Sequence, residues 1–95
     1  AQGVALRILT RGPSPDQDRL RFGFRTCLAR EPSTEELATL ANFLASQRMR
    51  FRDSDQDAKA VAPARRPVGI HAAEAAAWTA VARVLVNLDE FITRE

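Results

Sequence analysis

The stretch AAAWTAVARVLVNL, residues 75–88, decides the fold. Its polar residues are Thr79, Arg83 and Asn87, which recur at every fourth position and therefore occupy one narrow stripe of a helix. The remaining positions are apolar and cover most of the circumference. Because a helix that is apolar nearly all round is surrounded by protein, we predict a central helix over 72–88, with one further helical turn after Asn87.

The segment upstream of this helix shows no sustained hydrophobic period. Pro63, Pro67 and Gly69 exclude a continuous helix over 53–70, and charged residues are frequent there. We therefore predict a long flexible loop over 53–70, which is the part of the chain that a protease should cut first.

Three further helices are predicted from their start and stop signals. Ser33 and Glu36 have the spacing of a capping box, which predicts a helix over 34–51. Pro15 follows a serine and stands two residues before Gln17, and this pattern predicts the start of a helix over 15–30. A short amphipathic pattern over 2–11 ends at a glycine–proline pair, which cannot continue a helix.

These elements predict an all-α fold, a small four-helix bundle with a long loop before the last, central helix. At 95 residues the chain is long enough for one helical domain over 1–95 and one modest core. Apolar residues recur at helical spacing on the predicted helices and should meet in that core. The predicted core residues are Phe24, Leu28, Leu40, Leu44, Trp78, Val81 and Leu85.

Composition excludes several classes of site. The single cysteine, Cys27, excludes an intramolecular disulfide and a cysteine-rich zinc site. The single histidine, His71, excludes a metal site built on two histidines. No apolar run approaches the ~18–20 residues that a membrane span needs, so we expect no span.

The candidate catalytic residues have simpler structural explanations. Cys27 falls on an apolar helical stripe and is expected to be a small buried hydrophobe. His71 precedes the central helix and is expected to be a helix-start residue. We predict no catalytic residue and no cofactor, and we expect that the chain is not an enzyme by itself.

One acidic segment has part of a calcium-binding pattern. Asp53, Asp55 and Asp57 would stand at positions one, three and five of such a loop. Ala58 and Ala64 then occupy the positions where the loop needs a glycine and a bidentate glutamate. We favour a solvated acidic segment and keep calcium binding as a minor alternative.

The basic residues are thirteen arginines and one lysine, which suggests nucleic-acid binding. Arg65 and Arg66, or the group Arg48, Arg50 and Arg52, could form a local basic patch. Acids are interleaved, however, the net charge is only +2, and tyrosine is absent. A weak nucleic-acid-binding module is therefore the less favoured alternative.

Two stretches resemble a known domain family. FRTCLAREPSTEEL, residues 24–37, and AAWTAVARVLVNLDEFI, residues 76–92, resemble the C-terminal end of a domain of unknown function abundant in planctomycetes and related bacteria. Cys27 stands where that family has an aliphatic residue. The resemblance implies large exported parent proteins, periplasmic or on the cell surface, which often also carry a cytochrome-c-like domain. It brings no catalytic residues with it.

The function we expect is a non-catalytic helical interaction or structural module at the C-terminus of a larger exported protein. An alternative is that the chain completes an enzyme or redox unit whose active residues lie upstream. We expect the partner to be the upstream part of the parent chain or another protein, with possible self-association. The interaction candidates are Val4, Leu6, Val86 and Phe91.

Overall fold

The structure is a computed structural model that describes residues 2–12, 15–66 and 69–93, the last five of these by their backbone alone. It contains five helices: α1 (Gln2–Arg11), α2 (Asp16–Leu28), α3 (Thr34–Asp53), α4 (Asp55–Val61) and α5 (Ala72–Thr93). No strand occurs in these described ranges. The all-α prediction is confirmed, whereas the number of helices is five and not four.

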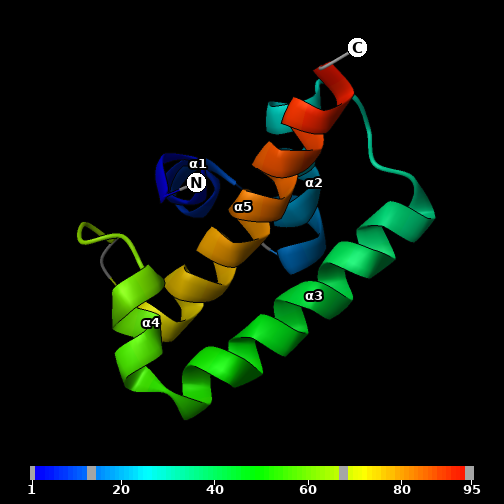
Figure 1. Cartoon of the computed structure of the whole chain (residues 1–95). Coiled ribbons are helices and arrows are strands. Elements are labelled where there is room, and N and C mark those ends of the chain that lie inside the picture. The colour runs from blue at the N-terminus through cyan, green and yellow to red at the C-terminus, as the bar shows by residue number, and fades with distance from the viewer. Residues whose placement is uncertain (1, 13–14, 67–68, 94–95) are drawn as a thin grey trace.

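Helix α5 runs through the middle of the molecule and contacts each of the other four helices (Figure 1). Trp78, Val81 and Leu85 on this helix are fully buried. The small side chains of Ala75, Ala76 and Ala77 are also fully buried, which leaves neighbouring helices free to approach the first half of α5 closely. Contacts with four other helices thus explain why the sequence of α5 is apolar around most of its circumference.

Helices α1 and α2 pack against each other and against α5. Gly23 of α2 lies at their close approach, because a Cβ atom there would stand 2.8 Å from Cδ1 of Ile8 on α1. Helix α2 ends at Leu28, two residues before the predicted end. Ala29 adopts a left-handed conformation with a φ of 56°, and its N–H donates to the carbonyl of Arg25, which terminates the helix.

Helix α3 begins with the predicted capping box. The Ser33 hydroxyl accepts a hydrogen bond from the Glu36 N–H at 3.1 Å, and the Glu36 carboxylate accepts one from the Ser33 N–H at 2.8 Å. These bonds satisfy two backbone donors that a helix start leaves without intrahelical partners. The helix continues to Asp53, two residues beyond the predicted end.

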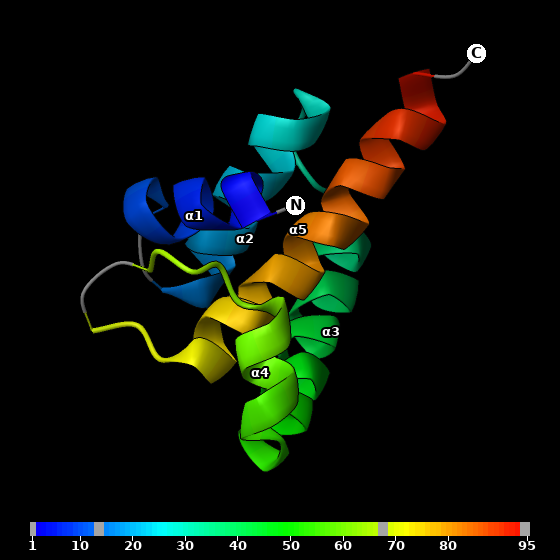
Figure 2. The ribbon, with the colours of Figure 1, turned by 60° about the vertical axis from the view of Figure 1, so that its left-hand side comes forward.

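The prediction of a loop over 53–70 is wrong for its first half, where the chain forms helix α4 (Figure 2). The Ser54 hydroxyl accepts a hydrogen bond from the Asp57 N–H at 3.4 Å, and Lys59 pairs with Asp55 at 3.1 Å. Only Ala58 of this helix is fully buried, and α4 packs against α5. A seven-residue helix with one buried alanine shows no hydrophobic period, so the sequence pattern could not reveal it.

The described residues also agree with the expectation that the chain has no membrane-spanning helix. None of the described helices combines the length and the apolar character that crossing a bilayer requires.

Candidate functional site

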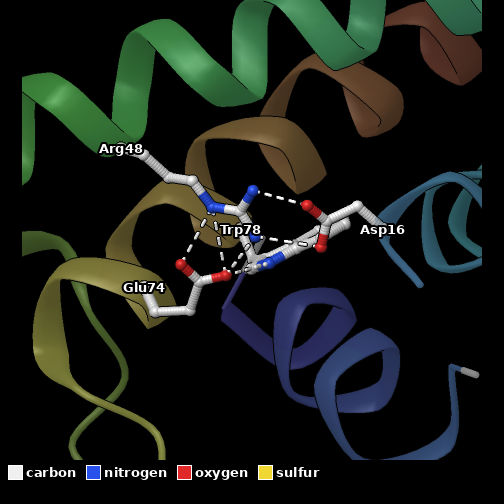
Figure 3. Close-up of polar contacts among 4 residues, drawn as sticks. All are labelled: Asp16, Arg48, Glu74 and Trp78. Atoms are coloured by element: carbon white, nitrogen blue, oxygen red, sulfur yellow. Dashed lines mark hydrogen bonds and ion pairs between the residues drawn. The ribbon is translucent and has the colours of Figure 1, made fainter. Parts of the chain in front are cut away.

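Four polar side chains from three helices converge beside the core (Figure 3). Arg48 near the end of α3 lies between Asp16, the first residue of α2, and Glu74 in the first turn of α5. Trp78 lies one turn after Glu74, and its indole N–H donates to the Glu74 carboxylate at 3.0 Å. We call Asp16, Arg48, Glu74 and Trp78 the arginine cluster.

The guanidinium of Arg48 binds both carboxylates through pairs of hydrogen bonds. Its Nη1 and Nη2 donate to Asp16 at 2.5 and 3.0 Å. Its Nε donates to the Glu74 carboxylate at 2.9 and 3.2 Å, and Nη2 makes a further short contact with Glu74. This paired geometry suits the planar arginine fork, for which lysine would be a poor substitute.

The charges in the arginine cluster stabilise one another. The hydrogen bond from Arg48 lowers the pKa of Asp16 below its usual range, although partial burial opposes the shift. The hydrogen bonds to Asp16 and then to Glu74 raise the pKa of Arg48 above its ordinary value. Asp16 is therefore ionised at neutral pH, and Arg48 stays charged at every pH the fold survives.

The indole ring of Trp78 is the apolar surface against which the charged groups lie. The guanidinium groups of Arg19 and Arg48 lie 5.8 and 6.0 Å from its ring centre, at the outer limit of a cation–π contact. The ring is fully buried, and its only polar atom is satisfied by Glu74. The cluster thus holds the starts of α2 and α5 against the end of α3.

The cluster forms one end of a groove between α2 and α3. The groove has a volume of about 500 Å³, and Asp16 and Arg48 are among its lining residues. Its apolar lining combines leucines from both helices with alanines that are exposed on α3. These residues are Leu20, Leu37, Leu44, Ala38, Ala41 and Ala45.

The structure gathers the predicted core residues into one hydrophobic cluster. Six of them are buried, namely Phe24, Leu40, Leu44, Trp78, Val81 and Leu85. Leu28, in the last turn of α2, is only partly buried and packs against the edge of that cluster.

The predicted interaction residues are less exposed than expected. Val4, Leu6 and Val86 are partly buried, and the side chain of Phe91 lies outside the described residues. Among the side chains that the structure describes, the large hydrophobic ones that are exposed are Met49 on α3, at 65%, and Leu88 on α5, at 39%.

The acidic segment considered for calcium is divided between two helices. Asp53 ends α3, whereas Asp55 and Asp57 lie in the first turn of α4, so these residues do not form a loop. All three are exposed, and Asp55 pairs with Lys59. Among the residues that the structure describes, no group of three or more histidine, cysteine or acidic side chains is placed to hold a metal ion.

The single histidine and the single cysteine lie on different elements. His71 is exposed at the start of α5, where its carbonyl accepts the Ala75 N–H at 3.0 Å. It borders a hollow of about 270 Å³ together with Arg52 and Glu74. Cys27 is partly buried near the end of α2, against the hydrophobic core.

Sequence reasoning placed Arg48 in a basic patch and missed its part in the arginine cluster. The four-residue spacing of Glu74 and Trp78 was visible, since side chains four apart on a helix are neighbours. Arg48 is 32 residues from Asp16 and 26 residues from Glu74 in the sequence. Its hydrogen bonds with them therefore depend on how three helices pack. Arg50, Arg52, Arg65 and Arg66 are exposed, as a basic patch would require.

Comparisons of this chain with protein-family models, with curated proteins and with solved structures found no match.

Proposed function

We propose that the chain is a non-catalytic helical module that binds a protein surface, with the upstream part of its parent chain as the first candidate. The observation that carries this proposal is the outer end of α5, which extends past the other helices (Figure 2) and carries apolar residues among its polar ones. Leu88 there is 39% exposed, and Val84 and Val86 are only partly buried.

The physical argument compares the two halves of α5. The first half is packed against other helices, and its residues from Ala75 to Trp78 are fully buried. The outer half is more polar, but Val84, Val86 and Leu88 there are not fully buried. Covering this surface would gain about 25 cal/mol for each Å² of apolar area removed from water. Val4 and Leu6 lie on α1, which packs against α5, and both are partly buried.

The arginine cluster supports a structural role for the polar residues. A catalytic base or nucleophile needs access to a substrate, whereas Asp16 and Glu74 are occupied by the same arginine. We propose that this cluster stabilises the arrangement of helices from which the α5 surface is presented. The position at the C-terminus of a larger exported protein remains part of the proposal, and it rests on the family resemblance.

Calorimetric titration of the chain with the upstream part of its parent protein tests this function. We expect binding, and we expect Leu88→Glu to weaken it at least about tenfold, because a charge would have to be buried in the contact. Met49→Glu, at an exposed hydrophobic residue on another helix, is the matched control and should leave binding unchanged. Absence of binding, or equal effects of the two variants, would overturn the proposal.

Two further measurements separate the two alternatives, an activity assay and a gel shift. If the chain completes an enzyme or redox unit, the upstream part should gain catalytic or redox activity when the chain binds it. If the chain binds nucleic acid, a gel shift should appear and weaken steeply as salt is raised. A non-catalytic protein-binding module gives neither result.

A further inference from the structure

An exposed side chain, Met49, and a groove lie on the same face of α3. The groove between α2 and α3 is bordered by Ala38, Ala41 and Ala45, whose small exposed side chains leave the α3 backbone open to close approach. Met49 is 65% exposed and stands beyond the other end of this alanine row. Methionine is a flexible side chain that adapts to irregular apolar surfaces.

The spacing of Ala38 and Met49 makes this face complementary to itself. Eleven residues are close to three helical turns, so both side chains lie on one face, roughly 16 Å apart along the axis. A two-fold axis that crosses α3 midway between them would place each Met49 over Ala38 of the other copy. At both ends of the contact the large side chain of Met49 then lies against the small side chain of Ala38. Between these ends, Ala45 of each copy lies beside Ala41 of the other.

The exposed charges on α3 favour the same antiparallel arrangement. Glu35 lies in the first turn and makes no ion pair with another described residue. Arg50 and Arg52 are exposed in the last turn, where Asp53 offsets one of the two positive charges. Antiparallel packing brings the acidic end of each helix beside the basic end of its partner, whereas parallel packing would bring like charges together.

We propose that a second copy of this chain docks on α3 in antiparallel orientation, with each Met49 entering the end of the partner's groove beside Ala38. The contact would be isologous and would close as a dimer. It lies on a different helix from the α5 surface in the proposed function, so each surface can be tested without the other.

Sedimentation equilibrium of the chain over a concentration series up to about 1 mM tests the dimer directly. We expect a reversible monomer–dimer equilibrium that Met49→Glu weakens at least about tenfold. Thr39→Glu places the same charge on an exposed position of α3, at least about a quarter turn away from each alanine of the row, and should leave the equilibrium unchanged. Circular dichroism of each variant establishes that it is folded.

Cross-linking tests the register. In a chain whose native Cys27 is replaced by serine, the double variant Ala38→Cys/Met49→Cys should give a covalent dimer with a short thiol-specific cross-linker. Met49→Cys alone in the same chain should not, because the two copies of position 49 lie far apart. A chain that stays monomeric at the highest concentration overturns the proposal. Equal effects of Met49→Glu and Thr39→Glu, or a dimer linked through position 49 alone, would also overturn it.

Two outcomes distinguish this proposal from the proposed function. Leu88→Glu should weaken binding of the upstream part of the parent and leave the dimer intact. Met49→Glu should do the reverse.

Discussion

At the scale of single residues, Trp78 combines two roles. Its ring is fully buried in the core, and its indole N–H is hydrogen-bonded to Glu74 at the edge of that core. Removing the side chain therefore leaves a cavity and also deprives a carboxylate of one donor.

We expect Trp78→Ala to lower the free energy of unfolding by about 3–5 kcal/mol. Domains of this kind are stable by only about 5–15 kcal/mol, so the variant should melt far below the parent chain. Thermal melts followed by circular dichroism measure this loss. Leu88→Ala, at an exposed apolar position, is the control and should change stability by less than about 0.5 kcal/mol. A small effect of Trp78→Ala would show that the ring is not central.

Arg48 is the second residue whose removal should be costly. Its side chain is 25% exposed, and it neutralises two carboxylates at once. We expect Arg48→Met to destabilise the chain by about 1–3 kcal/mol, since Asp16 and Glu74 lose their partner. Adding Glu74→Gln should cost less in this variant than in the parent chain, because the two residues act through a shared interaction. Urea denaturation of the parent chain, the two single variants and the double variant measures this coupling. Strictly additive losses in the free energy of unfolding would contradict it.

At the scale of elements, the start of α3 should make stability depend on pH. The hydrogen bond from Arg30, then that from the Ser33 backbone, lowers the pKa of Glu36 from 4.5 to about 2. A carboxyl whose pKa is lowered in the folded state stabilises the fold above its unfolded pKa. This stabilisation is lost as pH falls from about 4.5 towards 2.

The variant Glu36→Gln isolates this contribution. We expect it to be less stable than the parent chain at neutral pH and to approach the parent's stability as the pH is lowered through that window. Denaturation at a series of pH values gives the difference. Glu35→Gln, at the exposed neighbouring position, is the control and should change stability at neutral pH less than Glu36→Gln does. A constant difference between Glu36→Gln and the parent would contradict the ionic explanation.

Helix α4 buries one side chain completely. Ala58 is fully buried, whereas Ala60, on the same helix, is exposed. We expect Ala58→Glu to detach α4 from α5 and to lower stability by about 1–3 kcal/mol, because a charge would have to be buried without a partner. Hydrogen exchange should show faster exchange across residues 55–61. Ala60→Glu is the matched control, and equal exchange in both variants would argue against the packing of α4.

At the scale of the whole molecule, every helix depends on α5. Since α5 contacts each of the other four helices, the loss of any one of them exposes part of its apolar surface. We therefore expect one cooperative unfolding transition, as is usual for small single domains. Circular dichroism, which reports all helices, and the fluorescence of Trp78, which reports the core, should give coincident transitions. Separate midpoints would show that part of the bundle unfolds independently.

Local patterns were enough to predict the all-α fold, the apolar central helix, the capping box at Ser33 and most of the core. Such features depend on hydrophobic period and on side chains a few residues apart, and the sequence displays both. Helix α4 could not be predicted in this way, because tertiary contact at Ala58 supports a segment too short to have a period. The arginine cluster and the groove beside α3 depend on the packing of helices distant in the sequence. In the sequence, nothing distinguishes Arg48 from the other basic residues. Only the fold brings Asp16 and Glu74 within hydrogen-bonding distance of its guanidinium.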